Sequence, residues 1–405
     1  MTSALTPELR ARRNAIFMLF LLPGLTISSW VTRTPDVRDL VGASTAQMGL
    51  ILFGLSLGSM IGVVLSGAAV ARWGARPVIV AGTIAIAAGA VTIGAGAAVG
   101  QGVLVAVGLG LFGFGMGGGE VAQNIEGAEV ERLLARSTLP TMHGFFSLGT
   151  VLGALAGMLL TAARFPVLVH LAVVAAVVVS ALAFAIRSTP ADVGRQPRVQ
   201  AREGATPPPR TPVWRDTRLL LIGCLILALA LAEGTANDWL PLVMVDGHGF
   251  DPAWGSGVYA VFALAMTVGR FAGGRLVDRY GRAVVLCASA LVGAAGLALV
   301  AFVDNQVVAA CAAILWGLGA SLGFPVALSA AGDSGEDSAA RVSFAATIGY
   351  IAFLVGPPVL GFVGEEVGLR GALVLVLGLV LVAAFASPAA RTPERADEPV
   401  GTARD

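Results

Sequence analysis

The chain has very few of the charged side chains with which a water-soluble protein covers its surface. Only 13% of its 405 residues are charged, whereas 56% are hydrophobic, and the mean hydropathy is +0.84. Ordinary soluble domains carry about 25% charged residues. A protein of this size with so little charge needs lipid as a solvent, so the composition excludes a set of soluble domains and predicts a polytopic membrane protein.

Lysine is absent, and the 26 basic residues, all arginine, nearly balance 25 acidic ones. The net charge of +1 gives no reason to expect a nucleic-acid partner. The three cysteines lie far apart in apolar stretches without CxxC spacing, which argues against a disulfide framework. The histidines also lack metal-ligand spacing, so we expect neither a metal site nor a cofactor; they are His143, His170 and His248.

The chain does contain long apolar runs of about 20 residues, the length with which a helix crosses the hydrocarbon of a bilayer. The runs are continuously apolar rather than alternating with period two, which favours helices over a barrel. The predicted spans are 14–32, 47–70, 77–97, 102–126, 140–161, 167–187, 218–243, 254–276, 284–303, 307–330, 341–363 and 369–386. The predicted fold is therefore an all-α polytopic membrane protein with twelve transmembrane helices.

The arginines are distributed unequally between the two sides of this arrangement. The side that includes both termini holds 21 of the 26 arginines, and the other side holds four. Because positive residues are enriched in cytoplasmic loops, both termini are predicted to be cytoplasmic in a bacterial inner membrane. The connection 188–217 contains six prolines and five arginines and predicts a flexible linker. It separates a six-helix half at 1–187 from another at 218–390, and 391–405 is predicted to be a flexible cytoplasmic tail.

The two halves contain an internal repeat. Residues 67–76 read GAAVARWGAR and residues 274–282 read GRLVDRYGR, both in the connection after the second span of a half. A shift of 207 residues pairs Gly67 with Gly274, Arg72 with Arg279, and Gly74 with Gly281. The same shift pairs glycines 149 and 157 with glycines 356 and 364. The halves are therefore expected to be related by a pseudo-twofold axis.

The second copy resembles the GxLxDRxGR loop of the major facilitator superfamily, and the six-plus-six architecture resembles that superfamily over the whole chain. The first copy has Ala71 where the family has aspartate. In the family this loop is implied to latch the outward-facing state. The residues expected to form the two latch loops are Gly67, Arg72, Gly74, Arg76, Gly274, Asp278, Arg279, Gly281 and Arg282. Their arginines suit an anionic inner leaflet, and their glycines allow close helix approach.

A finer resemblance is to bacterial inner-membrane transporters related to fucose permeases. It is carried by Glu120 and Asn124 leading to Glu131, by Met142-His143, and by Glu233 with Asn237-Asp238. The first half has Gly149-Thr150 where drug/proton antiporters typically have a Gly-Pro pair.

Ionisable residues inside the spans are the candidates for function, because each costs at least about 2.5 kcal/mol near the bilayer centre and must face a cavity or a partner. The candidates for proton coupling or substrate binding are Glu233, Asn237, Asp238, Glu120, Asn124 and His143. The alternative for Glu233 is a structural carboxylate paired with an interior arginine. The alternative for His143 is a histidine that bonds a backbone carbonyl.

Arg270 is expected chiefly as a structural partner for a carboxylate such as Asp278. Trp30, Arg33, Tyr350 and Trp316 are candidates for the lining of a cavity. Helix packing and the aromatic belt explain the polar stripe of the first span and its tryptophan nearly as well.

These features predict a secondary transporter that moves a small organic solute by alternating access around a mid-membrane cavity, with H⁺ as the coupling ion. The protein is expected to be a monomer in a lipid bilayer and not an enzyme. An exporter of drugs or metabolites remains open within the same superfamily. A membrane sensor or receptor without turnover remains open as a different class, and an intramembrane enzyme would need a catalytic pair, for which only Glu120 and His143 qualify.

Overall fold

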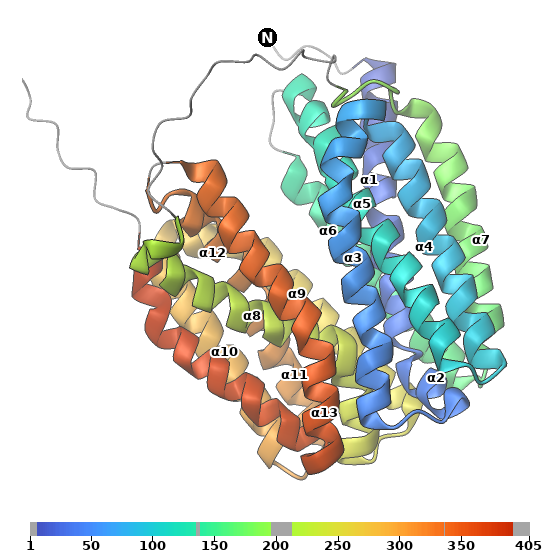
Figure 1. Ribbon diagram of the computed structural model, residues 1–405, viewed down its shortest axis with the longest axis vertical. Helices are drawn as coiled ribbons and strands as arrows, with labels where there is room; N and C mark the ends of the chain where they lie inside the picture. The colour runs from blue at the N-terminus through green and yellow to red at the C-terminus, as the bar shows by residue number, and fades with distance from the viewer. Residues whose placement is uncertain (1–5, 135–137, 196–212, 336, 392–405) are drawn as a thin grey trace, which may run out of the picture.

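The chain folds into two bundles of helices that lie side by side (Figure 1). The computed structural model describes residues 6–134, 138–195, 213–335 and 337–391. Parts of the predicted linker and tail, at 196–212 and 392–405, lie outside the described residues. Within the described residues no strand is present, and eleven helices are long and apolar enough to cross a membrane.

The first bundle, coloured blue to green, consists of α1 (Pro7–Val31), α2 (Thr34–Val41), α3 (Thr45–Trp73), α4 (Ala75–Ala98), α5 (Gly102–Leu134), α6 (Leu139–Ala162) and α7 (Val167–Ala185). The second bundle consists of α8 (Thr217–Leu242), α9 (Pro252–Tyr280), α10 (Arg282–Phe302), α11 (Gln306–Ala320), α12 (Gly323–Gly332) and α13 (Ser338–Ala386). One π-helical turn, η3 (Val243–Gly247), extends α8.

These helices match the twelve predicted spans with three differences. Span ten is broken into α11 and α12, because the chain leaves helical hydrogen bonding at Ser321-Leu322. Spans eleven and twelve run together as α13, whose interior Gly368 has φ +77° and turns the chain. The short helix α2 lies in the connection between the first two spans and has no counterpart among the predicted spans.

Close glycine contacts hold the first bundle together. A Cβ at Gly58 would lie 1.9 Å from the carbonyl oxygen of Gly110, and a Cβ at Gly82 would lie 2.8 Å from that of Gly115. These distances place α3 and α4 in backbone contact with α5. Since helices in lipid associate through van der Waals packing rather than through burial from water, such small-residue faces stabilise the bundle.

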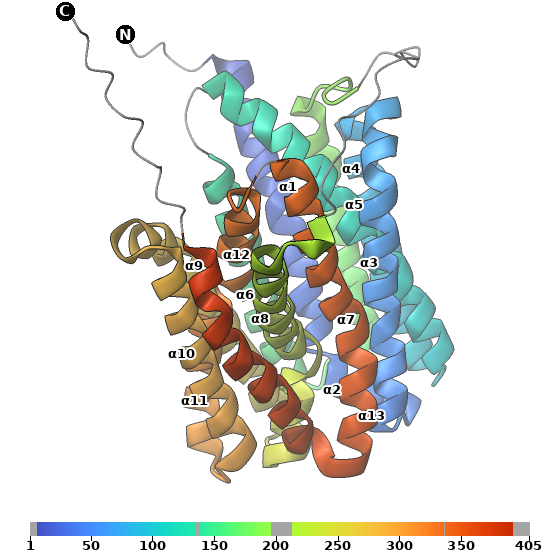
Figure 2. The same ribbon diagram turned by 60° about the vertical axis from the view of Figure 1, so that its left-hand side comes forward.

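The two bundles meet through α3 against α13 and through α6 against α9 (Figure 2). The hydrogen bonds between them in the described residues lie at the end of the molecule away from the termini. Arg38 pairs there with Asp246, and the Ser256 hydroxyl donates to the carbonyl oxygen of Thr32 at 2.8 Å. A Cβ at Gly49 would lie 2.7 Å from the carbonyl oxygen of Pro357 in the same region. The bundles are therefore closed against each other at the end away from the termini (Figure 1).

Candidate functional site

An ion pair lies near the middle of the second bundle. Nη2 of Arg270 on α9 lies 2.7 Å from Oε1 of Glu233 on α8, and the two side chains are 30% and 13% exposed. Arg270 thus pairs with a carboxylate, as expected, but the partner is Glu233 rather than Asp278, and the contact is the one foreseen by the alternative interpretation of Glu233. Asp278 lies two turns further along α9, is exposed, and makes no ion pair with any residue that the structure describes.

Glu120 faces this ion pair from the first bundle. Its side chain is exposed and lies within electrostatic range of Arg270 and Glu233, without a hydrogen bond or ion pair to any described residue. Tyr350 of α13 lies within electrostatic range of Glu120, and His143 of α6 within that of Arg270, without a hydrogen bond in the described residues. We call these five residues the interbundle site. An exposed carboxylate at mid-helix that faces the opposite bundle shows that accessible space separates the bundles at this level.

The glycines of α5 before Glu120 pack against two neighbouring helices of the first bundle. Gly113 and Gly117 lie against backbone atoms of α3, whereas Gly115 lies against α4 and Gly119 approaches it. These two contacts occupy two faces of α5. With a rotation of about 100° per residue, Glu120 lies about 20° from Gly113, at the edge of the face that contacts α3.

The other polar candidates on α8 lie beside the interbundle site. The hydroxyl of Tyr259 donates to Oδ1 of Asn237 at 3.2 Å. Asp238 is buried, and within the described part of the chain no hydrogen bond or ion pair is made by its carboxyl group. Glu233 is one helical turn from Asn237, so both are on one face of α8, whereas Asp238 is rotated from Asn237 by about 100°.

The structure does not join Glu120, His143 and Asn124 by hydrogen bonds in the part of the chain that it describes. His143 is exposed, and its ring packs edge-on against the ring of Phe20, with 5.2 Å between centroids. Asn124 is half-buried one turn beyond Glu120. The three side chains thus come from neighbouring elements without forming a bonded cluster.

Three of the four residues expected to line a cavity are buried in helix packing, and only Tyr350 is half-exposed near the interbundle site. Trp30 is 1% exposed, and the Trp316 indole donates to the carbonyl oxygen of Ala232 at 3.1 Å. Arg33 Nε donates to His170 Nδ1 at 3.0 Å, and its Nη1 lies 2.7 Å from Asp36. Arg33 therefore belongs to a buried network at the end away from the termini.

The two latch loops share one backbone conformation but have different surroundings. Gly74 has φ +88° and Gly281 has φ +79°, a region that favours glycine, as the repeat requires. The first loop is covered, because a Cβ at Gly74 would lie 2.1 Å from the carbonyl oxygen of Ala191. The second loop is open, since a Cβ at Gly281 or Gly274 would meet nothing within 4 Å.

The remaining latch residues are also placed by the structure. Gly67 has open space around it, Arg76 is half-exposed, and Arg72 lies over the ring of Trp73. Arg279 lies over the ring of Tyr280, and Arg282 pairs with Asp333 at 2.6 Å.

Two interactions near the termini were not anticipated. Arg12 Nε lies 2.6 Å from Oε1 of the fully buried Glu126, which ties α1 to α5. Glu131 Oε2 accepts from the backbone N–H groups of Thr138 and Leu139 at 2.6 and 2.8 Å, and so caps α6. Glu126 could have been noticed as a carboxylate near the end of a span with arginines close to the N-terminus. In the described chain no group of three His, Cys, Asp or Glu side chains could hold a metal ion.

Comparison with known proteins places this arrangement in context. The family model described as "Major Facilitator Superfamily" matches residues 15–348. An uncharacterized MFS-type transporter of Yersinia pestis is 30% identical over 92% of this chain and 94% of its own length. Membrane protein MosC of Rhizobium meliloti is 24% identical over 92% of this chain and 89% of its own.

Solved structures share the fold. The nucleoside transporter NupG superposes with a TM-score of 0.71 at 17% identity, over 95% of this chain and 99% of its own. A variant of the E. coli fucose:proton symporter FucP superposes with a TM-score of 0.62 at 18% identity, over 94% of this chain and 98% of its own.

Proposed function

Because the chain belongs to the major facilitator superfamily and is thus a multi-pass membrane transporter rather than an enzyme, we propose that it moves a small organic solute in exchange for, or together with, protons. The observation that carries the proposal is the position of Glu120, which faces the Arg270–Glu233 pair from the opposite bundle. Fully ionised, these three side chains carry two negative charges and one positive charge. Binding one proton, or one cationic group of a solute, removes the excess charge.

The mechanism follows from competition for one guanidinium. In the present arrangement Arg270 is bonded to Glu233, and Glu120 is accessible between the bundles. When the two bundles rotate relative to each other, they close on the side that carries the termini. Glu120 then approaches Arg270 and competes with Glu233 for its guanidinium. Protonation of either carboxylate removes the competition and lowers the cost of closing the site, which couples proton binding to the movement.

The solute is proposed to be polar, and to bind among Glu120, His143, Tyr350 and Asn237. These side chains offer both donors and acceptors of hydrogen bonds, and the hydroxyl of Tyr259 orients Asn237. The similarity in fold to a nucleoside transporter and to a fucose:proton symporter supports a hydroxylated solute. The carboxyl group of Asp238 is buried beside the interbundle site, and we propose that it acts on the site electrostatically.

The setting is proposed to be the bacterial inner membrane, with a monomer whose termini are cytoplasmic and whose present conformation faces inward. The arginine distribution supports this orientation. Residues 1–187 and 218–390 are proposed as the two moving units. Part of the connecting segment packs on the first unit, since the backbone N–H of Ala75 donates to the carbonyl oxygen of Val193 at 2.8 Å.

Flux into proteoliposomes tests the proposal, with a panel of metabolites and drugs and with or without an imposed pH gradient. The expected result is accumulation of at least one solute that depends on the gradient. Glu120→Gln and Glu233→Gln should abolish accumulation but retain downhill exchange. Glu366→Gln, which changes an exposed carboxylate outside the site, is the matched control.

Three outcomes would contradict parts of the proposal. Accumulation that is insensitive to the gradient would exclude protons as the coupling ion. Full gradient-driven accumulation by Glu233→Gln would remove Glu233 from the coupling. Binding without flux in every arm would favour a sensor. Comparing right-side-out with inside-out vesicles assigns the direction and so separates an importer from an exporter.

A further inference from the structure

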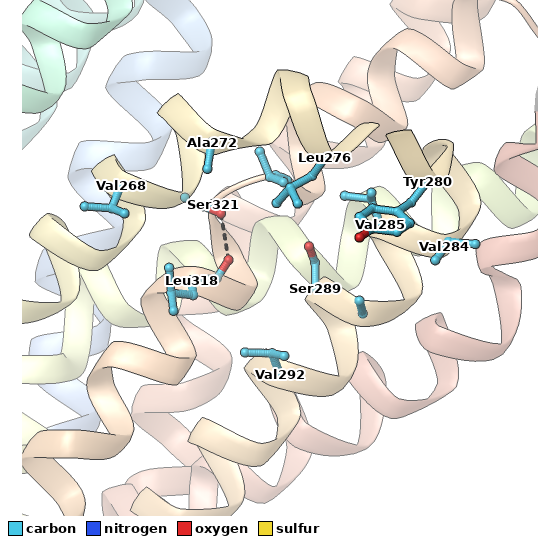
Figure 3. A pocket seen from close by; sticks show the side chains of 13 residues that line it. Val268, Ala272, Leu276, Tyr280, Val284, Val285, Ser289, Val292, Leu318 and Ser321 are labelled. Carbon is cyan, nitrogen blue, oxygen red and sulfur yellow. Dashed lines mark hydrogen bonds between the residues drawn. The ribbon is translucent and has the colours of Figure 1, made fainter. Parts of the chain in front are cut away.

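An apolar groove lies in the second bundle, lined by residues of α9, α10 and the end of α11 (Figure 3). Its volume is about 480 Å³. Val268, Ala272 and Leu276 of α9 form one wall, and α10 forms the opposite wall (Figure 3). Leu318 and Ser321 close the groove at the end of α11, where the Ser321 hydroxyl donates to the Leu318 carbonyl oxygen at 2.6 Å.

The internal repeat shows how residues of the groove differ from their counterparts in the first bundle. In the first bundle, Gly82 and Gly115 bring α4 and α5 into backbone contact. The shift of 207 residues replaces them by Ser289 and Leu322, which both line the groove. α10 and α11 stay in backbone contact, because a Cβ at Gly319 would lie 2.3 Å from Cα of Gly293 and 2.7 Å from the carbonyl oxygen of Ser289. The groove therefore lies between α9 and α10.

The groove is separate from the contact between the bundles. Phe271, whose ring would lie 2.6 Å from a Cβ at Gly144 of α6, faces the first bundle. Leu276 in the groove is rotated from Phe271 by about 140° around α9. The groove therefore faces the bilayer, and Val268, Leu276 and Val284 in its walls are exposed to it.

Positive charge lies at the end of the groove nearest the termini. Tyr280 lines this end, and Arg279 lies over its ring with 5.3 Å from Cζ to the centroid. Arg275 is exposed and lies about 100° from Leu276 around α9, between the groove and the side of Phe271. Neither arginine makes an ion pair with a described residue. Asp278 lies about 160° from Leu276 around the helix, on the face opposite the groove.

We propose that this groove binds one acyl chain of an anionic phospholipid, whose phosphate lies between Arg275 and Arg279. The apolar walls accept the chain at a depth where only hydrocarbon is available. The two arginines select the charge of the headgroup, as basic residues at a membrane surface do. The interaction fixes the separation of α9 and α10 and does not depend on the identity of the transported solute.

Native mass spectrometry of the full chain, delipidated in a neutral detergent, tests this site. Phosphatidylglycerol and phosphatidylcholine with identical oleoyl chains are added in separate arms. We expect retention of one phosphatidylglycerol in preference to phosphatidylcholine. The Arg275→Gln/Arg279→Gln protein should retain phosphatidylglycerol about fivefold more weakly for each arginine removed. Arg72→Gln, at the equivalent place of the first bundle, should leave retention unchanged.

The hydrocarbon part of the site is tested by filling the groove. Ala272→Phe should weaken retention of phosphatidylglycerol with both arginines intact, and Ala288→Leu serves the same purpose should the first variant fail to fold. Equal retention of the two lipids, an equal loss in Arg72→Gln, or no effect of filling would overturn the proposal. Complete displacement of phosphatidylglycerol by inorganic phosphate would also overturn the proposal, because the acyl chain would then contribute nothing to binding. A protein dimer that dissociates when lipid is added would overturn the proposal as well, since a second copy of the protein would then occupy the groove.

Discussion

Removing the guanidinium of Arg270 should destabilise the protein far more than removing its carboxylate partner. Arg270→Gln leaves the 13%-exposed Glu233 without its cation and beside a second carboxylate, Glu120. Breaking a buried ion pair by removing one partner costs about 3–5 kcal/mol. Because the Arg270 side chain is 30% exposed, water compensates part of this cost, and we expect a loss of about 2 kcal/mol.

Glu233→Gln has a smaller expected effect because Arg270 keeps a charged partner. Glu120 interacts with Arg270 across the bundles and becomes the only carboxylate of the three. The expected loss is below about 1 kcal/mol, the range of partly exposed ion pairs. The double variant Arg270→Gln/Glu233→Gln should recover more than half of the loss of Arg270→Gln, since the 13%-exposed Glu233 is no longer left charged without its cation and only the exposed Glu120 keeps a charge.

Reversible unfolding in mixed micelles with increasing sodium dodecyl sulfate gives the free energies of unfolding to compare. Arg215→Gln, which removes an exposed arginine stacked on a neighbouring tryptophan, is the control and should change stability by less than about 0.5 kcal/mol. Equal losses for Arg270→Gln and Glu233→Gln, with no recovery in the double variant, would refute the idea that two carboxylates share one guanidinium.

Three further measurements address the closed end, the surface and the orientation. Gly49→Val should reduce transport at least about tenfold, because its Cβ would lie 2.7 Å from the Pro357 carbonyl oxygen and prevent closure; Gly378→Ala, which meets nothing within 4 Å, should transport normally. A hydrogen bond from Arg341 is the main cause that lowers the pKa of Asp216 below its usual value. The stabilisation of the folded state by this carboxylate is therefore present above the usual pKa and is lost as the pH falls through the lower pKa of the folded state. The difference in unfolding temperature between wild type and Asp216→Asn should therefore shrink between about pH 5 and strongly acidic pH, and a constant difference would contradict it. A green fluorescent protein fused to the C-terminus should fluoresce in bacteria, whereas a dark fusion would reverse the proposed orientation.

The spans could be predicted from the sequence because each is a continuous apolar run, and the linker-separated halves followed from the repeat. The break between α11 and α12 could not, since Ser321 and Leu322 interrupt neither the apolar run nor its composition. The helix α2 escaped prediction because it is short and carries charged residues, as a loop does.

The site was predictable as a set of residue types but not as a geometry. The cost of intramembrane charge singles out Glu120, Glu233 and Arg270 in the sequence. Which carboxylate bonds Arg270 depends on how α8 and α9 are rotated against each other, and spacing along the chain does not contain that rotation. The burial of Trp30 and Trp316 has the same origin, because an aromatic side chain in a span fits a packing contact as well as a cavity wall.

The glycine contacts of the first bundle have a mechanical consequence. Backbone-to-backbone packing along α3, α4 and α5 leaves few side chains whose rotamers can adjust. The first bundle should therefore rotate as a rigid body. The second bundle has a hinge of its own where the helix is interrupted between α11 and α12. Bending during a transport cycle should therefore concentrate in the half that carries Arg270 and Glu233, where a change in charge can act on it directly.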